Sequence, residues 1–570
     1  MKISIDWLKE LVDLKAPIDE VIRLLPLRTI GTKEITHDFI ELDMKGYNRA
    51  DLLSMRGVAY EITAITDSKV TFSEPKENEY IWMGQNLPET PVKVGDQELS
   101  PLYCIAKITG LKVEPSSKKW VKKLIDSGIR TVNNIADVTN LVMLEYGQPS
   151  HAFDAAKVKG SVGVRLAQKD ERMTTLDGKI RNFTETDLLI TDGDGPIGLA
   201  GVMGGKESEI TDTTTEILLE VAIFDPKTIR KTANRLALPS EASTRFLHCL
   251  TKTRAFQALN ALIGMYQELG GKLEAISIVD NLEEKEKVVI LTQEKINSLI
   301  GIDIPPTDVE LFLNKIGFKL ASHMTSGNVV WEVTVPYWRL DIEIEADLIE
   351  EVARMYGYEK IPPQKLRGKL PEKIDQSLFD LLYNLKTKLV GLGLTEVQTY
   401  SFYSSKTIND LRSSDRKLCL RLTINDLVKI ANPISSETEY LRNDIWPNLL
   451  EKTAENLKYF KEVVVFEIGK AYQAKPQLQE EYRLSMLLAK DSTDPTPELY
   501  QIAQEALKHL RGEPWLLGGG KPDGNEYFHP TRFATLEKDG KEVGFVAEIH
   551  PRIANKFGIE KRVAVLEIKI

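Results

Sequence analysis

The sequence predicts an α+β protein made of several domains, on three observations. The chain has 570 residues, enough for about three or four domains of ordinary size. Segments with helical periodicity alternate with short segments of strand periodicity along its length, without any repeat. At 42% hydrophobic and 28% charged residues, the composition is that of a globular protein with several cores.

Breaks in this pattern predict four domains, of which the first two cover residues 1–75 and 90–282. The first starts with an amphipathic segment and continues with a strand near Phe39–Leu42 and a helix that carries Asn48–Asp51. The second is rich in short strands and glycine turns, and we expect it to have mixed β structure. A long helix at 251–269 closes it.

The third predicted domain, residues 287–363, follows the charged run Glu283–Lys287 and ends at Pro362-Pro363. It is expected to be a small helical, winged-helix-like module with strands at both ends. The expected strands and helices are Val288–Leu291, 293–299, 307–316 and Val330–Val335.

Residues 373–570 form the fourth predicted domain. A helix over Gln376–Leu392 opens it, and the alternating apolar pattern of Val563–Ile568 predicts a final strand. The segment is large enough for one antiparallel sheet with flanking helices.

Composition excludes several classes of protein. A formal net charge of −10 argues against a protein that coats nucleic acid through its overall field. No stretch approaches the ~20 apolar residues of a membrane helix, and the first residues do not resemble a secretion signal. Cys104, Cys249 and Cys419 lie far apart, which favours a reducing cytoplasmic location over a disulfide scaffold or a zinc site.

One local basic stretch could contact RNA despite the acidic total. Lys118, Lys119, Lys122 and Lys123 flank Trp120, a combination that could meet a phosphate backbone. The alternative, a solvated helix face, is favoured by the sequence alone.

Clustered acids in the third domain indicate a metal site. Asp347, Glu350 and Glu351 stand at positions i, i+3 and i+4 of an amphipathic helix, and Asp341 lies at its entrance. Like charges held together either face water or bind a hard cation, and Mg²⁺ suits oxygen ligands. The alternative is that the early acids complement the helix dipole while Arg354 pairs with Glu350.

A second set of residues suggests a small polar pocket. His151 is one of seven histidines, Thr139-Asn140 precedes it, and Glu220 ends an apolar run. The glycine-rich segment Ala200–Glu207 fails the phosphate-loop pattern and is instead typical of a turn that brings backbone close to another group. The alternative is a structural histidine on a loop. No Ser-His-Asp signature accompanies these residues, so covalent catalysis has no support.

Several long segments resemble the beta subunit of phenylalanine–tRNA ligase, most closely in its bacterial form. The resemblance runs nearly end to end and in the family's order. The matching segments are Asn48–Ala59, Val138–Asn140, Gly147–Asp154, Gly198–Gly205, Glu241–Phe246, Val335–Tyr358, Asn432–Arg442 and Gly544–Pro551.

The resemblance implies an α2β2 tetramer whose alpha subunit joins phenylalanine to its tRNA with ATP and magnesium. The C-terminal domain would be a class II synthetase-like antiparallel sheet without catalytic residues, and residues 373–570 indeed lack the Gly-x-Gly-x-Gly run that leads to an ATP-binding arginine. The family's Mg²⁺ site falls on Asp341, Asp347, Glu350 and Glu351, and the remaining ligands would come from the alpha subunit.

The resemblance also implies an editing domain that hydrolyses tyrosine wrongly joined to the phenylalanine tRNA. Glu220 would recognise the tyrosine hydroxyl, and Thr139, Asn140 and His151 would position the ribose or the attacking water. Backbone at Ala200, Gly201, Gly204 and Gly205 would line the pocket. An apolar pocket rejects an added hydroxyl only weakly, which is why a second pocket is needed.

Two departures from the family bear on function. Leu247-His248 replaces the usual Glu-Arg after Arg245-Phe246. The length also indicates a short form, without the oligonucleotide-binding barrel that relatives insert near position 35 and without their C-terminal anticodon-binding domain, so we expect a weaker beta-side grip on tRNA. Two alternatives remain open: a scaffold subunit that has lost editing, and a deacylase that works alone.

Overall fold

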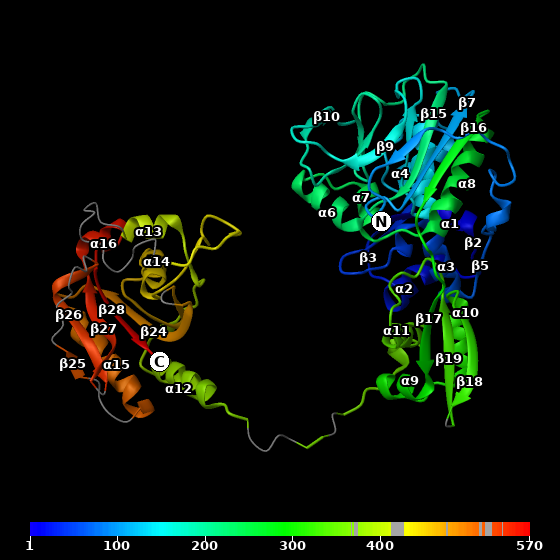
Figure 1. Ribbon diagram of the computed structural model, residues 1–570. Coiled ribbons are helices and arrows are strands. Elements are labelled where there is room, and N and C mark those ends of the chain that lie inside the picture. The colour runs from blue at the N-terminus through cyan, green and yellow to red at the C-terminus, as the bar shows by residue number, and fades with distance from the viewer. Residues whose placement is uncertain are drawn as a thin grey trace. The chain divides into compact units, whose positions relative to one another are not determined.

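The computed structural model describes residues 1–325, 327–365, 368–369, 374–411, 427–474, 477–511, 516–518, 527–538 and 540–570. The chain forms two compact units, Met1–Lys365 and Leu366–Ile570, and each combines helices with sheets (Figure 1). The prediction of an α+β protein of several domains is therefore confirmed. Cys419 and the expected start of the last domain at 373 lie outside the described residues.

The first unit starts with a module in which helices α1 and α3 pack on a three-stranded sheet of order β1-β4-β3. Only three residues, 36–38, join β3 to β4 in a hairpin, so no further domain is inserted near position 35. The elements of this module are β1 (Lys2–Ser4), α1 (Ile5–Leu11), β2 (Val12–Asp13), α2 (Ile18–Arg28), β3 (Thr32–Ile35), β4 (Phe39–Leu42), α3 (Met55–Thr66) and β5 (Lys69–Val70).

The predicted helix over Asn48–Asp51 is wrong. A short 3-10 turn covers Asp51–Leu53, and α3 begins only at Met55. Ser54 causes this start because its hydroxyl accepts a hydrogen bond from the backbone N–H of Gly57 at 3.0 Å, as an N-cap residue does. The Arg49 guanidinium binds the Asp51 carboxylate (2.8 and 2.6 Å) and holds the preceding segment in a turn.

The central module contains two larger sheets. One has five strands in the order β14-β13-β12-β9-β6, and the other has four in the order β16-β7-β15-β8. The elements are β6 (Val92–Val94), β7 (Leu102–Thr109), α4 (Lys118–Asp126), α5 (Asn134–Tyr146), β8 (Ser150–Asp154), β9 (Val162–Leu166), β10 (Arg172–Thr174), β11 (Ile180–Asn182), β12 (Leu188–Thr191), β13 (Pro196–Leu199), β14 (Met203–Gly204), β15 (Glu216–Ile223), α6 (Pro226–Arg235), α7 (Glu241–Leu247), α8 (Lys252–Glu268) and β16 (Lys272–Asp280).

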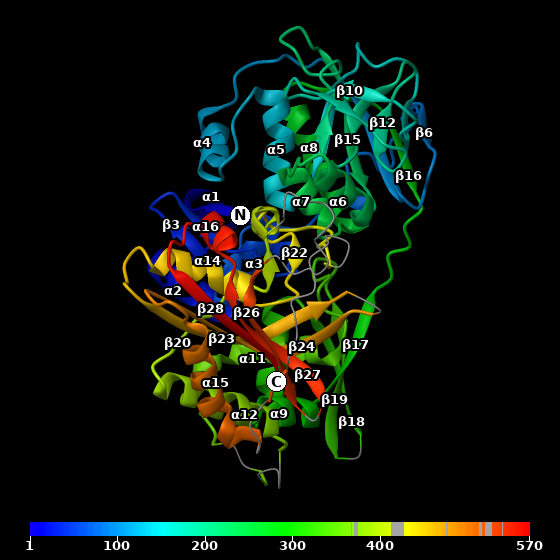
Figure 2. The same ribbon diagram turned by 90° about the vertical axis from the view of Figure 1, so that its left-hand side faces the viewer.

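Helices α5 and α8 pack against each other and against the four-stranded sheet, and Figure 2 shows them side by side next to β15. Strand β15 is almost continuously buried because it lies between β7 and β8 and is covered by this layer. A polar residue in such a strand must face either a partner or a cavity. Glu220 is that residue.

The third module has a three-stranded antiparallel sheet, β17-β19-β18, covered by three helices. Strand β18 has no counterpart in the sequence prediction because six of its seven residues are exposed, which leaves no apolar alternation to find. The elements are β17 (Lys287–Thr292), α9 (Gln293–Ile300), α10 (Pro306–Lys315), β18 (Lys319–Thr325), β19 (Asn328–Val335) and α11 (Glu345–Tyr356).

The first three predicted domains share core residues and so form one compact unit. Leu124, Leu141 and Leu144 of α4 and α5 belong to the core of the N-terminal module. Ala64 of α3 belongs to the core of the third module. Burial of apolar surface across these boundaries ties the modules together.

The second unit is built on a seven-stranded sheet of order β20-β23-β24-β28-β27-β26-β25, antiparallel except for the β20–β23 pair. Helices α13, α14 and α16 contribute to the core on one face, and α12 and α15 to the core on the other. The elements are α12 (Ser377–Gly391), β20 (Thr395–Glu396), β21 (Phe402–Tyr403), α13 (Ser405–Leu411), β22 (Tyr440–Leu441), α14 (Trp446–Asn456), β23 (Val463–Gln473), β24 (Gln479–Lys490), α15 (Thr496–Arg511), β25 (Leu516–Gly518), β26 (Phe528–Lys538), β27 (Lys541–Ile549), α16 (Pro551–Lys556) and β28 (Arg562–Lys569).

Two apolar faces explain why β28 reads as a nearly continuous hydrophobic run. Val563 and Val565 belong to one core, whereas Ala564 and Leu566 belong to the other, as the alternation of side chains along a strand requires. Among the described residues, no helix is both long and apolar enough to cross a membrane.

Candidate functional site

Two neighbouring strands of the central module bring two of the predicted site residues together. Strands β8 and β15 pair in antiparallel orientation, with His151 directly opposite Glu220. Directly opposed residues in such a pair place their side chains on the same face of the sheet. The imidazole and the carboxyl group therefore share one side of the four-stranded sheet.

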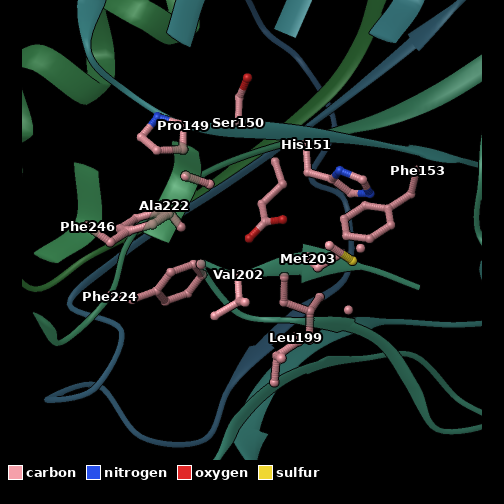
Figure 3. A pocket seen from close by; sticks show the side chains of 16 residues that line it. Pro149, Ser150, His151, Phe153, Leu199, Val202, Met203, Ala222, Phe224 and Phe246 are labelled. Carbon is pink, nitrogen blue, oxygen red and sulfur yellow. The ribbon is translucent and has the colours of Figure 1, made fainter. Parts of the chain in front are cut away.

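Both side chains line a cavity with about 500 Å³ of empty space, part of it open to solvent. Figure 3 shows His151 and Phe153 on one side of the cavity and Phe224 and Phe246 on the other. The lining residues are Pro149, Ser150, His151, Phe153, Ile190, Gly198, Leu199, Gly201, Val202, Met203, Gly204, Glu220, Ala222, Phe224, Ala242 and Phe246.

Glu220 is the only acid among the lining residues. The residue is 5% exposed, and within the described part of the chain no cation pairs with it. Burial in apolar surroundings disfavours the charged form and raises the pKa of Glu220 to about 8. The carboxyl group is therefore mostly protonated at pH 7, and it can both donate and accept a hydrogen bond.

His151 is also uncharged at pH 7. Burial lowers the pKa of its imidazole to about 4. The ring stands edge to face against Phe153, with 4.5 Å between the centroids. Its Nε2 atom is hidden from solvent and makes no hydrogen bond within the described chain. A buried imidazole nitrogen without a partner is a position for a ligand or a water molecule.

Strand β14 and the loop before it pack closely on neighbouring side chains because Gly204 of β14 and Gly201 of the loop carry no side chain. A Cβ atom on Gly204 would lie 2.6 Å from the His151 ring. Gly201 has a φ of +66°. A Cβ atom added at this position would lie 3.0 Å from the side chains of Ile229 and Phe246. Side chains at either position would push into the cavity wall.

Four of the predicted pocket residues do not line the cavity. Ala200 is 1% exposed and belongs to the core of the module, and Gly205 uses its N–H to bind the Ile197 carbonyl (2.8 Å). Thr139 lies on α5, where its hydroxyl donates to the Ala136 carbonyl at 2.7 Å. Asn140 lies beside it on the same helix. These four residues thus lie outside the lining of the cavity, and the role of Thr139 and Asn140 at the ribose or the attacking water stays a prediction.

Sequence reasoning missed the aromatic residues of the cavity. Phe224 follows β15 directly, where an apolar residue is indistinguishable from ordinary core. Phe246 belongs to a segment that we matched to the family, although without a role.

The departure at Leu247-His248 is accommodated at the end of α7. His248 is the C-cap residue of this helix, and its Nδ1 lies 2.8 Å from the Thr244 carbonyl. The preceding Arg245 is buried, and its Nε donates to the Leu53 carbonyl at 3.1 Å. The replacement therefore leaves the helix end and the Arg245 contact in place.

The acidic helix α11 lies in a buried network of charges that joins the first and third modules. Arg354 donates to both oxygens of Glu61 on α3 (2.7 and 3.0 Å) and to Glu351 on its own helix (2.9 Å). Arg49 also binds Glu61 at 2.6 Å. Burial alone would raise the pKa of Glu61, but Arg354 and Arg49 outweigh it and lower that pKa to about 2.

The four predicted magnesium ligands do not fit a metal site built by this chain. Both oxygens of Asp341 accept hydrogen bonds from Arg339 (2.9 and 2.7 Å), and Glu351 binds Arg339 and Arg354. Asp347 accepts the backbone N–H groups of Glu343 and Ile344 at the start of α11, whereas Glu350 is exposed.

The arginines explain the disagreement with the sequence prediction. They neutralise Asp341 and Glu351, two of the four acids that a cation would otherwise hold together, and Arg354 pairs with Glu351, not with Glu350. Across the described residues, no group of three or more histidines, cysteines or acids is arranged to hold a metal ion.

The basic stretch on α4 is largely neutralised as well. Lys122 pairs with Asp6, Asp38 and Asp126, and Lys119 and Lys123 both pair with Glu10. These contacts attach α4 to the N-terminal module. They support the solvated, structural interpretation over an RNA surface.

Most of the chain matches models of known protein families. Residues 99–271 match the family model described as B3/4 domain, residues 289–358 the tRNA synthetase B5 domain, and residues 361–570 the phenylalanyl tRNA synthetase beta chain CLM domain. A relative from Staphylococcus haemolyticus, named phenylalanine–tRNA ligase beta subunit, is 34% identical over 91% of this chain and 65% of its own length. One with the same name from Synechococcus sp. is 32% identical over 94% of this chain and 67% of its own length. The chain belongs to the phenylalanine–tRNA ligase beta-subunit family.

Other members of the beta-subunit family show the same extent of similarity. The beta subunit from Streptococcus agalactiae serotype V is 32% identical over 92% of this chain and 66% of its own length. The chain thus spans about two thirds of the length of these relatives. The cavity lies within the segment that matches the B3/4 domain, and the charge network reaches the segment that matches the B5 domain.

Proposed function

We propose that this chain acts as the beta subunit of a phenylalanine–tRNA ligase. It would support the ATP-dependent attachment of phenylalanine to its tRNA by an alpha subunit, in a cytoplasmic α2β2 tetramer. The names of its relatives and the matches along most of the chain support this role. We further propose that the cavity at His151 and Glu220 hydrolyses tyrosyl-tRNA.

The observation that carries the editing proposal is the neutral carboxyl group of Glu220 in a cavity walled by aromatic and aliphatic side chains. The aromatic ring of tyrosine suits these walls, and its hydroxyl can exchange a hydrogen bond with Glu220. Phenylalanine would leave the buried carboxyl without a partner, at a cost of about 1–3 kcal/mol. The cavity therefore favours tyrosine, the amino acid that should be removed.

The reaction is a simple ester hydrolysis. Water attacks the carbonyl carbon of the tyrosyl ester, the bond to the ribose oxygen breaks, and that oxygen takes a proton. Tyrosine leaves as a carboxylate, with release of one proton at neutral pH. His151 is too weak a base to ionise water, so its Nε2 would orient the water by a hydrogen bond, and rate enhancement would come from positioning.

Amino-acid activation is assigned to the alpha subunit. The three arginines in the described strands of the second unit, Arg483, Arg532 and Arg562, all pair with acids of the same unit. Arg442 pairs with Glu467 in the interior. These guanidinium groups are already occupied, which speaks against a site for the phosphates of ATP here. Magnesium would accordingly belong to the alpha subunit's reaction.

A scaffold subunit without editing is the second candidate. The low pKa of His151 makes its imidazole a weak base, and no stronger base lies among the lining residues. This observation favours the scaffold role. The alternative of a free-standing deacylase is disfavoured because the large second unit would then have no purpose.

Co-expression with a phenylalanine–tRNA ligase alpha subunit tests both parts of the proposal. The purified complex should charge tRNA with phenylalanine, whereas the beta chain alone should not exchange pyrophosphate with ATP. The complex should also release tyrosine from tyrosyl-tRNA faster than buffer does. Charging without such release would support the scaffold role, and failure to associate with the alpha subunit would contradict the subunit role.

A further inference from the structure

Helix α6 carries a stripe of basic residues that no acid neutralises. The three cations of the stripe, Lys227, Arg230 and Lys231, stand at positions i, i+3 and i+4, the polar Asn234 follows at i+7, and all four residues are exposed. Residues at this spacing lie along one face of a helix, about 5–6 Å apart. Within the described chain, none of the three cations forms a salt bridge, and α6 contains no acid.

The opposite face of α6 is fixed to the module. Ile229, Thr232 and Ala233 are buried, and the Thr232 hydroxyl donates to Asp187 at 2.8 Å. Arg235, at the end of the helix, also binds Asp187. The helix is therefore held in one orientation, and its basic stripe is a fixed feature of the surface.

The buried face of α6, opposite the stripe, lies beside the cavity. Ile229 of α6 packs against Gly201: a Cβ atom added at Gly201 would lie 3.0 Å from the Ile229 side chain. Gly201 is itself a lining residue of the cavity, as is Phe246 of α7. After α6, Ser240 donates a hydrogen bond to the Val202 carbonyl at 2.9 Å. One layer of side chains thus separates the helix from the cavity wall, and Figures 1 and 2 show α6 next to α7 at the edge of the module.

The contrast with α4 is informative. There, Lys119, Lys122 and Lys123 pair with acids of the N-terminal module, so they have a structural role. On α6 the cations have no partner in a chain with a net charge of −10. Unpaired cations in a row attract a row of negative charges, such as the phosphates of a nucleic-acid strand.

We propose that Lys227, Arg230, Lys231 and Asn234 of α6 bind the phosphates of the single-stranded 3′ end of the tRNA and so direct its esterified terminus to the neighbouring cavity. This inference rests on the proposed editing function for the direction of the strand. The binding itself does not depend on hydrolysis. The four residues are positioning residues, because they contact the RNA away from the ester.

The binding test uses the complex with the alpha subunit and two RNA probes. One is an acceptor-stem minihelix with its single-stranded CCA end, and the other is the same stem without that end. Fluorescence anisotropy should show that Lys227→Ala/Arg230→Ala/Lys231→Ala binds the first probe roughly tenfold more weakly than the parent. The slope of log affinity against log salt should fall by about 2, since each phosphate contact on a single strand contributes about 0.7.

A matched control removes three unpaired, exposed lysines elsewhere in the same unit, as Lys287→Ala/Lys295→Ala/Lys319→Ala. It should bind both probes as the parent does. An equal loss on both probes for the α6 variant, or an equal loss for the control, would overturn the assignment to the 3′ strand. Unchanged binding by the α6 variant would overturn it as well.

Hydrolysis separates this inference from the proposed function. The α6 variant should raise the KM for tyrosyl-tRNA and leave the hydrolysis of 2′(3′)-O-tyrosyl-adenosine, which has no phosphates, at the parent rate. If the parent complex hydrolyses neither substrate, the editing proposal fails, whereas loss of binding to the CCA probe would still support the role of α6. If both substrates are hydrolysed equally slowly by the variant, the cavity has been damaged and the positioning role is contradicted.

Discussion

His151 and Glu220 lie directly opposite each other on β8 and β15, and both are uncharged at neutral pH. In water at neutral pH, a glutamate carboxyl group is ionised and a histidine is partly protonated. Here the apolar wall of the cavity suppresses both charges. The cavity therefore offers hydrogen-bonding groups without a net charge, which suits a neutral phenol better than a carboxylate or phosphate ligand.

The raised pKa of Glu220 predicts a dependence of stability on pH. The folded chain keeps this proton up to about pH 8, whereas the unfolded chain loses it near the ordinary value of 4.5. Stability should therefore fall as pH rises between these values, by at most about 1.4 kcal/mol per pH unit from this group. In urea unfolding at pH 5, 6.5 and 8, the free energy of unfolding of Glu220→Gln should increase relative to that of the parent as pH rises. For the control Glu185→Gln, at an exposed position, the difference in unfolding free energy from the parent should be the same at all three pH values. If that difference is also independent of pH for Glu220→Gln, the prediction is contradicted.

Gly204→Ala should impair the cavity without unfolding the module. Its Cβ atom would come within 2.6 Å of the His151 ring, so the imidazole must move and with it the proposed water. We expect at least a tenfold loss of tyrosyl-tRNA deacylation, equivalent to about 1.4 kcal/mol in the barrier. Gly264→Ala on α8 is the control, because its Cβ atom would meet only Ile81 at an ordinary 3.6 Å. Equal activity of the two variants would show that the close approach of Gly204 is unimportant.

Glu61→Gln should destabilise the first unit. The substitution removes a buried carboxylate that pairs with Arg354 and Arg49, and breaking one partner of a buried ion pair typically costs about 3–5 kcal/mol. Because the folded pKa of Glu61 is about 2, the parent should also lose roughly 3 kcal/mol as pH falls from 4.5 to 2. The variant should lack this loss. Thermal unfolding across that pH range measures both effects, with exposed Glu77→Gln as the control. A Tm of Glu61→Gln equal to that of the parent at pH 7 would refute the role of the network.

Magnesium should not stabilise the beta chain by itself. Asp341 and Glu351 already bind Arg339 and Arg354, so a cation would have to displace guanidinium groups from a buried site. We expect the Tm of the chain to be the same in 5 mM EDTA and in excess Mg²⁺, within about 1 °C. A rise in Tm with Mg²⁺ that disappears in Asp341→Asn would restore the metal assignment.

The sequence supports prediction of local features better than of contacts between distant segments. Periodicity placed the helices at 251–269 and 293–299 within a residue or two of α8 and α9. Glu220 stood out because an acid in an apolar strand needs a partner or a cavity. The pairing of Arg354 with Glu61 spans 293 residues, and no local pattern reveals it. The acids of α11 resembled a metal site although Arg339 and Arg354, which pair with Asp341 and Glu351, are near them in the sequence. The spacing of the carboxylates alone does not show which of them an arginine occupies.

The same limit applies around the cavity. Thr139 and Asn140 precede His151 closely in the sequence, yet α5 carries them elsewhere. Phe224 and Phe246 form the wall of the cavity, but an apolar residue in a buried segment gives no sign that it faces empty space. Charge on α6 and on α4 looks alike in the sequence, and only the paired acids distinguish the two helices.

The most direct test of the central claim compares the hydrolysis of tyrosyl-tRNA and phenylalanyl-tRNA by the complex with the alpha subunit. The parent should release tyrosine much faster than phenylalanine. Glu220→Ala, which removes the hydrogen-bonding group, should lower kcat/KM for tyrosyl-tRNA by roughly 10- to 100-fold and bring the ratio of the two rates close to one. Glu220→Gln should keep part of the discrimination. A Glu220→Ala complex that clears tyrosyl-tRNA at the parent rate would contradict the account.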